Sequence, residues 1–154
     1  MNKKIILGLS LVVIAVMAIG AVSAFDLGSL LGGSENQTVT IDGIDFNVPE
    51  GYVEVEDQAI INETQVQGPI TYTTNCKVYG KDSTEVALLV GNYGEYNVTD
   101  DVVAGLGGEA KTIKNVKGYM DHDDEYYVFS YAKDNKFAVI STNDESAIAD
   151  FIIE

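Results

Sequence analysis

Residues 125–142 (EYYVFSYAKDNKFAVIST) constrain the fold more strongly than any other stretch of the chain. Two runs rich in Tyr, Phe, Val and Ile, residue types that favour strands, flank a short polar segment. A two-residue turn at Asp134-Asn135 suits a type I′ hairpin, because Asp and Asn tolerate positive φ better than other residues that carry a side chain. The stretch therefore predicts an antiparallel β-hairpin.

The turn also determines which residues of the predicted hairpin face one another. Ala132 lies opposite Phe137, and Phe129 lies opposite Ile140. Because side chains alternate between the two faces of a strand, one face of the hairpin is predicted to be strongly apolar. Its members are Tyr127, Phe129, Tyr131, Ala138 and Ile140. We expect the rest of the domain to pack on this face.

The N-terminus has the features of an export signal. Lys3 and Lys4 precede an uncharged, apolar run at 5–22, and the small residues Val22 and Ala24 suit cleavage before Phe25. Residues 1–24 are therefore predicted to be a signal peptide. The alternative is an uncleaved membrane anchor, because eighteen apolar residues can span a bilayer. Both interpretations place the folded part outside the cytoplasm, secreted or held on the outer face of the cell membrane.

The remaining chain divides into a linker and one domain. Residues 25–37 contain three Gly and two Ser without hydrophobic periodicity, which predicts a flexible tether. Residues 38–154 are predicted to form a single domain. Within it, Asp42-Gly43 predicts a hairpin over 38–48, and alternation predicts strands at 52–56, 70–79, 85–90 and 112–120. Residues 59–68 are ambiguous and are expected to be a loop with some strand in it.

Two helices are predicted in this domain. Thr99 is a candidate N-cap, followed by two acids and a Gly cluster that ends the helix after about two turns. Thr142 and Glu145 have capping-box spacing ahead of an apolar stripe that predicts a helix running to the C-terminus. The prediction is an α+β fold: an antiparallel sheet of about six or seven strands, with a short internal helix and a C-terminal helix packed on one face.

Charge restricts the partners that such a domain can have. The formal net charge is −15, and all nine basic residues are Lys. Such a surface repels nucleic acid, and without Arg it has no bidentate clamp for phosphate. The predicted partner is a protein or another component of the cell envelope, with membrane contact only through the N-terminal segment if that segment is not cleaved.

Residues 121–125 hold the only His and the densest acids of the chain. Oxygen-rich clusters bind Ca²⁺, which makes Asp121, His122, Asp123 and Asp124 candidate metal ligands. The EF-hand pattern is absent, however, because its sixth position is Tyr126 instead of Gly. A solvated turn between two strands is the preferred interpretation, and no cofactor is predicted.

Catalytic signatures are few. The chain has one His and no Gly-x-Ser-x-Gly elbow, and nothing singles out a pair among its 24 acids. The lone Cys76 lies on the apolar side of its predicted strand, which indicates a buried inert thiol; a nucleophile or an intermolecular disulfide are the alternatives. We therefore do not expect an enzyme.

Two further sets of residues are candidate surface sites. Asn36, Asn62 and Asn97 each begin an Asn-x-Thr sequon, the acceptor sequence for glycosylation. Tyr96, Tyr119 and Tyr126 lie near predicted strand ends or turns and are candidates for contact with a partner, because exposed Tyr offers a large contact area. The alternative is that these Tyr cover the outer face of the sheet.

Residues 43–52 (GIDFNVPEGY) resemble the opening of PsbP/DcrB-like domains, in which a strand with an aromatic residue precedes Pro-x-Gly and another aromatic residue. Tyr52 stands here where Trp is usual. The resemblance implies a compact α/β sandwich with a non-catalytic, extracytoplasmic role in binding or assembly. The Lys-only, Asn-rich composition is also similar to that of small secreted proteins of methanogenic archaea.

The sequence is compatible with three functions. The leading hypothesis is a secreted or cell-surface, non-catalytic binding domain. The alternatives are an acidic surface protein that binds a metal such as Ca²⁺, and a small secreted hydrolase.

Overall fold

A computed structural model describes residues 35–154 of the chain. The predicted signal peptide or anchor, and residues 25–34 of the predicted tether, lie outside the described residues. The elements in chain order are β1 (Gln37–Ile41), β2 (Ile44–Val48), β3 (Val53–Glu54), the 3-10 helix η2 (Glu56–Gln58), β4 (Ile60–Gln67), β5 (Ile70–Lys81), β6 (Thr84–Asn92), α2 (Asp100–Ala104), β7 (Glu109–Ile113), β8 (Val116–His122), β9 (Tyr127–Lys133), β10 (Lys136–Thr142) and α3 (Ala147–Phe151).

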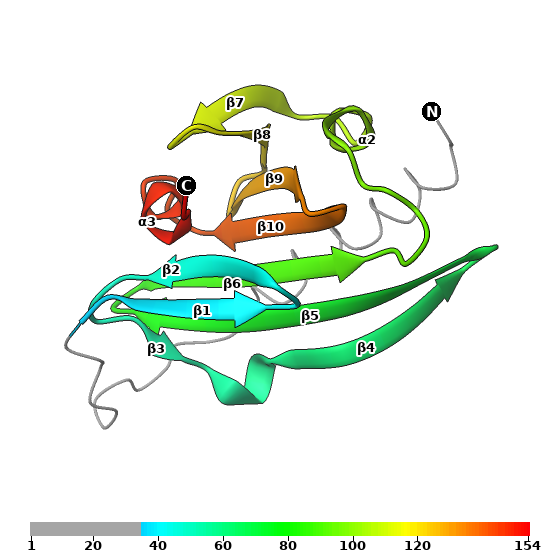
Figure 1. Cartoon of the computed structure of the whole chain (residues 1–154). Helices are drawn as coiled ribbons and strands as arrows, with labels where there is room; N and C mark the ends of the chain where they lie inside the picture. The colour runs from blue at the N-terminus through cyan, green and yellow to red at the C-terminus, as the bar shows by residue number, and fades with distance from the viewer. Residues whose placement is uncertain (1–34) are drawn as a thin grey trace.

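The fold is α+β in the broad sense, with far more strand than helix (Figure 1). The main sheet has eight strands in the order β3-β5-β6-β10-β9-β8-β7, and β4 also pairs with β5. Every pairing in it is antiparallel. β1 and β2 form a separate two-stranded sheet. The prediction of six or seven strands was therefore too low, for two local reasons.

The first reason is β4, where the sequence predicted mostly loop. Its residues pair regularly with β5, from Gln67 opposite Ile70 to Glu63 opposite Thr74. A bulge then shifts the register before Ile60, and Asn62 adopts a φ of 50°. The bulge and the exposure of an edge strand remove the apolar alternation by which strands are recognised.

The second reason is the segment predicted as one strand at 112–120. It is a hairpin of β7 and β8 that turns at Lys114-Asn115, where φ is 45° and 63°. Two successive residues with positive φ are the mark of a type I′ turn, which Asn favours. Lys at the first turn position concealed this signal in the sequence.

The other hairpins are confirmed. β9 and β10 pair with Ala132 opposite Phe137 and Phe129 opposite Ile140, as predicted. Asp134 and Asn135 have φ values of 50° and 61°. The β1–β2 hairpin turns at Asp42-Gly43, again with positive φ at both positions.

The main sheet is buried on both faces, whereas the sequence predicted a cover for one. Phe137 and Val139 of β10 point to the face that carries α2, and Ala138 and Ile140 point to the face that carries α3. We call the two clusters the α2-side core and the α3-side core. The α2-side core consists of Val55, Ile70, Tyr72, Cys76, Val78, Ala87, Leu89, Tyr93, Val98, Val102, Val103, Val128, Phe137 and Val139. The α3-side core consists of Ile41, Ile44, Phe46, Val48, Tyr79, Val86, Leu88, Val90, Met120, Phe129, Tyr131, Ala138, Ile140, Ala147, Ile148, Phe151 and Ile152.

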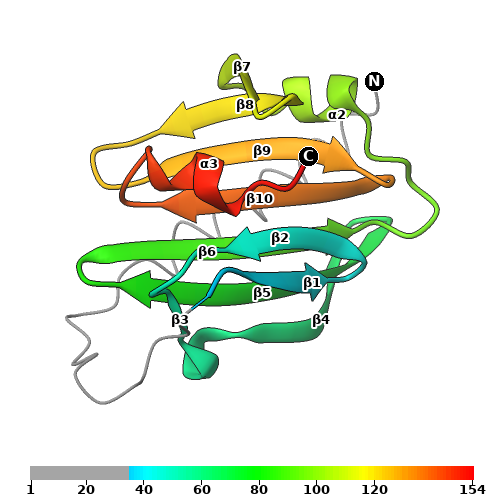
Figure 2. The same ribbon diagram turned by 60° about the vertical axis from the view of Figure 1, so that its left-hand side comes forward.

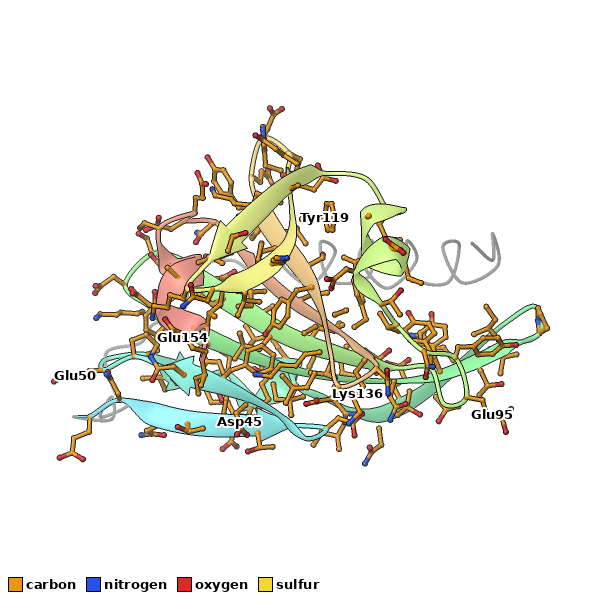
Figure 3. All side chains as sticks on the ribbon, turned by 45° about the horizontal axis from the view of Figure 1, so that its top comes forward. Asp45, Glu50, Glu95, Tyr119, Lys136 and Glu154 are labelled. Carbon is orange, nitrogen blue, oxygen red and sulfur yellow. The ribbon has the colours of Figure 1, made fainter. Side chains whose placement is uncertain are left out.

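The cover of the α3-side core comes from the two ends of the described chain. The β1–β2 hairpin lies over β5 and β6, and α3 lies over β9 and β10 (Figure 2). The two covers meet where Phe46 and Ile152 form an isolated antiparallel bridge. Lys136, labelled in Figure 3, adds a polar link between β10 and the β1–β2 turn, because its ammonium donates to the carbonyl of Asp42.

Both helices are shorter than predicted. α3 ends at Phe151, and Ile152 continues in an extended conformation because it bridges to β2. The apolar stripe is nevertheless buried as predicted, at Ala147, Ile148, Phe151 and Ile152. At α2, Thr99 occupies the N-cap position without the predicted side-chain hydrogen bond. No helix within residues 35–154 is long and apolar enough to cross a bilayer.

Candidate functional site

Three connections meet at one end of the main sheet, at the left in Figure 2. They are the β5–β6 turn, the start of β9 and the β10–α3 connection. The pairing of Thr142 with both Val86 and Tyr127 places these segments together. We call this region the loop end and define it by the residues that line its hollow: Ser83, Thr84, Tyr127, Asn143, Asp144, Glu145 and Ser146.

Asn143 ties two of these connections together. Its side-chain oxygen accepts the backbone N–H of Glu85 at 3.0 Å, and its side-chain nitrogen donates to the carbonyl of Ser83 at 2.8 Å. The side chain of Asn143 therefore links the β10–α3 connection to the β5–β6 turn through two hydrogen bonds. An Asn with two well-formed hydrogen bonds holds the turn and the β10–α3 connection in a fixed relation.

Asp144 organises the entry to α3. Its Oδ1 accepts the backbone N–H of Ser146 at 3.0 Å and the hydroxyl of Ser146 at 2.7 Å. The predicted capping box does not form: Thr142 Oγ1 accepts from the N–H of Asp144 at 3.1 Å, and Glu145 instead forms an ion pair with Lys111 of β7. Asp144 thus forms an Asx turn just before α3, and the N-cap residue Ser146 makes no side-chain cap hydrogen bond.

The hollow has a volume of about 530 Å³, and its lining is predominantly polar. It offers the hydroxyls of Ser83, Thr84, Tyr127 and Ser146 and the carboxylates of Asp144 and Glu145. Two groups next to the hollow have raised pKa values. Burial, followed by the charges of Asp144, Asp150 and Asp82, raises the pKa of Tyr52, and burial raises the pKa of Glu85. The hollow can therefore accept hydrogen bonds and favours positive charge.

The acidic turn between β8 and β9 lies at the same end of the sheet. Asp121, His122, Asp123 and Asp124 are all exposed. Asp121 Oδ1 accepts the N–H of His122, and Asp123 Oδ1 accepts the N–H groups of Glu125 and Tyr126, which lower the pKa of Asp123. Within residues 35–154, no three His, Cys, Asp or Glu side chains are grouped closely enough to hold a metal ion. The His122 ring lies 5.8 Å from that of Tyr127.

The three candidate Tyr do not form one surface. Each is half-buried. Tyr96, after β6, and Tyr119, on β8, pack against the α2-side core, and Tyr119 lies on the side of β8 that faces α2 (Figure 3). Tyr126 lies beside the loop end. Burial raises the pKa of Tyr126, and the nearby charge of Glu85 raises it further. Tyr96 and Tyr126 are at opposite ends of the sheet, since β6 begins at the end where Tyr126 lies and Tyr96 follows the last residue of β6.

The sequons and the thiol are placed as follows. Asn36, Asn62 and Asn97 are all exposed, and Asn36 Oδ1 accepts the N–H of Glu50. Cys76 is 1% exposed, within the α2-side core, which confirms its predicted strand face. Burial raises the pKa of its thiol to about 12, so the nucleophilic thiolate is strongly disfavoured.

Sequence reasoning missed the hollow because its walls are distant in the chain. Asn143 and Ser83 are separated by 60 positions, and only the register of β6 on β10 brings them together. The local signal that existed, Thr142 to Glu145, was interpreted as a helix cap. Known proteins add nothing to this geometry: no family model, no curated protein and no solved structure matches the chain.

Proposed function

We propose that this protein is a non-catalytic binding domain that acts outside the cytoplasm and recognises its partner with the loop end. One observation carries the proposal. Connections far apart in sequence converge on a polar hollow, where the side chain of Asn143 joins the β10–α3 connection to the β5–β6 turn and the side chain of Asp144 orders the entry to α3. A site whose lining is fixed before binding loses little conformational entropy when it captures a ligand.

The chemistry of the hollow indicates the kind of partner. Hydroxyl groups and carboxylates line it, and the acidic turn at Asp121–Glu125 lies at the same end of the sheet. The whole chain carries a net charge of −15. Amino groups and hydroxyl groups complement such a surface, whereas nucleic acid is repelled. We propose a basic protein segment or a hydroxyl-rich component of the cell envelope as the partner.

The hydrolase alternative receives less support from the same residues. Ser146 donates its hydroxyl to Asp144, whose Oδ1 also accepts the backbone N–H of Ser146, so the pair forms a local turn before α3. A nucleophilic Ser needs a base such as His held by a third group. His122 instead lies against the ring of Tyr127.

The metal-binding alternative also receives less support. In the acidic turn, one oxygen each of Asp121 and Asp123 is already an acceptor for local backbone N–H groups. A Ca²⁺ site needs six to eight converging oxygens. Calorimetric titration of the protein with Ca²⁺ and Zn²⁺ separates this alternative from the proposal, because a binding domain of the kind proposed releases no specific heat with either ion.

Extracytoplasmic action rests on the charge and hydropathy pattern of residues 1–24. The similarity of residues 43–52 to PsbP/DcrB-like domains supports the same role. In this segment Gly51 has a φ of 88°, and the Tyr52 ring packs edge-on against Phe151 at 4.8 Å. The Pro-x-Gly-aromatic sequence thereby anchors β2 to α3.

The test compares two Arg substitutions. Ser83→Arg fills the hollow with a bulky cation, and Thr99→Arg places the same side chain at an exposed position before α2. Immobilised parent and Thr99→Arg proteins should retain the same component of a cell-envelope extract, and Ser83→Arg should lose it. Equal retention by all three proteins, or turnover of a peptide or glycan by the parent, would contradict the proposal.

A further inference from the structure

β4 is a free edge of the main sheet. It pairs with β5 and with no other strand in the described part of the chain. The strand at the opposite edge, β7, likewise pairs only with β8. A free edge presents backbone N–H and C=O groups that can pair with another strand, so proteins commonly protect such edges with charges or Pro.

The two edges are protected very differently. β7 carries Glu109 and Lys111 within five residues, and Lys111 is held in an ion pair with Glu145. β4 contains one charge, Glu63, in eight residues, and its last four residues, 64–67, contain none. β4 therefore lacks the electrostatic protection that β7 has.

β4 also carries the exposed apolar surface. Among residues 35–154, the large hydrophobic side chains that are exposed are Ile61 and Val66, at 76% and 72%. Both belong to β4. Exposed apolar side chains on an edge strand that lacks electrostatic protection are typical of a site of strand addition.

We propose that β4 pairs with β4 of a second copy of this chain, in antiparallel orientation about a twofold axis, to form one continuous sheet across a homodimer. The sequence of β4 fits a second copy as the occupant, because a twofold axis places the uncharged residues 64–67 of one copy against the same uncharged residues of the other. Residues 35–154 contain 23 Asp and Glu and 7 Lys, a net charge of −16. Two copies repel one another over most of their surface, and the neutral stretch of β4 is where they can approach.

The symmetry is compatible with the residues of β4. A twofold axis at Thr64 or Gln65 keeps the two Glu63 carboxylates from lying directly opposite each other, since Glu63 then faces residue 65 or 67 of the other copy. An isologous contact uses the same strand on both copies and closes on itself, so it yields a dimer and leaves the β7 edges free. The loop end also stays accessible, because β4 pairs with the first half of β5 and the loop end follows its last residue.

Disulfide trapping tests the geometry on the chain produced from its full coding sequence. Glu63, Thr64, Gln65 and Val66 are replaced singly by Cys, and Lys111→Cys and Thr112→Cys on β7 serve as controls. Cys76 is retained because it is buried. On mild oxidation we expect a covalent dimer whose yield peaks at one or two neighbouring positions of β4 and is low on β7. Equal yields on both edges, no dimer from any β4 position, or a product with a different protein would overturn the proposal.

A matched pair of substitutions tests the same interface without cross-linking. Thr64 on β4 and Thr112 on β7 are both exposed residues of edge strands. By sedimentation velocity, the parent and Thr112→Asp should dimerise with similar Kd, and Thr64→Asp should weaken dimerisation at least tenfold while melting within a few degrees of the parent. A parent that stays monomeric at high concentration, or an equal effect of the two substitutions, would refute a β4 dimer.

Discussion

The two cores on either face of the main sheet differ in how they are closed and in what they contain. The α3-side core is covered by β1–β2 and α3, which come from opposite ends of the described chain and meet at the Phe46–Ile152 bridge. The α2-side core contains the thiol of Cys76 and the hydroxyl of Tyr93. Within residues 35–154, Thr74 Oγ1 and Tyr93 Oη are buried on this side without a hydrogen-bond partner, and on the other side the same holds for Asp42 Oδ2 at the β1–β2 turn.

The two faces of one sheet therefore contribute to stability in different ways. The α3-side core contains no thiol, and its two buried Tyr, Tyr79 and Tyr131, lie among apolar side chains. It joins the ends of the domain, so its covers contribute directly to cooperativity. The α2-side core tolerates polar groups whose burial lowers stability. Substitutions on the α3 side should therefore have the larger effects, and some on the α2 side should increase stability.

The largest effect is expected from deleting residues 147–154, which removes one cover of the α3-side core. Ile148 and Phe151 are fully buried and Ile152 is 3% exposed. Each such side chain contributes on the order of 1.5–3 kcal/mol, and their sum approaches the whole stability of a small domain. The truncated chain should show no cooperative thermal transition by circular dichroism. Removal of Ile153 and Glu154 alone is the control. A cooperative melt of the longer truncation near the parent temperature would show that α3 is dispensable.

The next effect is expected at Gly118 of β8, also on the α3 side. A Cβ at this position would lie 2.6 Å from Phe129 Cζ and 2.6 Å from the backbone oxygen of Ser130. The ring could shift, but the paired strand β9 cannot, so Gly118→Ala should lower the free energy of unfolding by about 3 kcal/mol or more. Urea denaturation measures the change. Lys117→Ala, at the exposed neighbouring position, should change it by less than about 0.5 kcal/mol.

The third prediction concerns the α2-side core and pH. The pKa of Cys76 is raised from an ordinary value of 9.0 to about 12 by burial. Between about pH 9 and pH 12 the thiol keeps its proton in the folded protein and loses it in the unfolded chain, which favours unfolding. The contribution of the protonated thiol to stability is therefore fully present below about pH 9 and is lost as the pH rises toward 12. At about pH 10.5 the loss should be roughly 2 kcal/mol relative to neutral pH.

Cys76→Val provides the control for this titration. Val carries no proton to lose, so its stability difference from the parent should change by that amount between about pH 8 and 10.5. Denaturation curves at several pH values measure it. A difference that stays constant with pH would mean that the thiol is not protected in the folded state.

The smallest effect is expected from a pair of Tyr substitutions in the α2-side core. The rings of Tyr72 and Tyr93 stack with their centroids 4.9 Å apart, yet the Tyr72 hydroxyl donates to Gln65 at 2.7 Å and the Tyr93 hydroxyl has no hydrogen-bond partner among the described residues. Tyr93→Phe removes a buried, unpaired hydroxyl and should raise the free energy of unfolding by up to about 1 kcal/mol. Tyr72→Phe should lower it by about 1 kcal/mol. Changes of the same sign in thermal melts would contradict this account.

Hairpins were predictable wherever a turn combined the right residues with alternating neighbours. Asp134-Asn135 and Asp42-Gly43 favour positive φ locally, so their strands follow from short-range chemistry. β4 escaped prediction because an edge strand that is largely exposed has no apolar face to display, and a bulge at Asn62 interrupts what alternation remains. The loop end escaped for a different reason, since its parts are brought together by strand register.

The sequence by itself determined the strand character, the turn positions and the inward side of each well-patterned strand, because these depend on φ preferences and on a two-residue period. It also determined that the domain is acidic and contains one thiol on an apolar strand face. Only the tertiary structure decided that both faces of the sheet are buried, that α3 ends where Ile152 joins Phe46, and that Asn143 reaches Ser83. Such contacts join residues far apart in the chain, and their geometry depends on how every intervening strand is ordered and registered in the sheet.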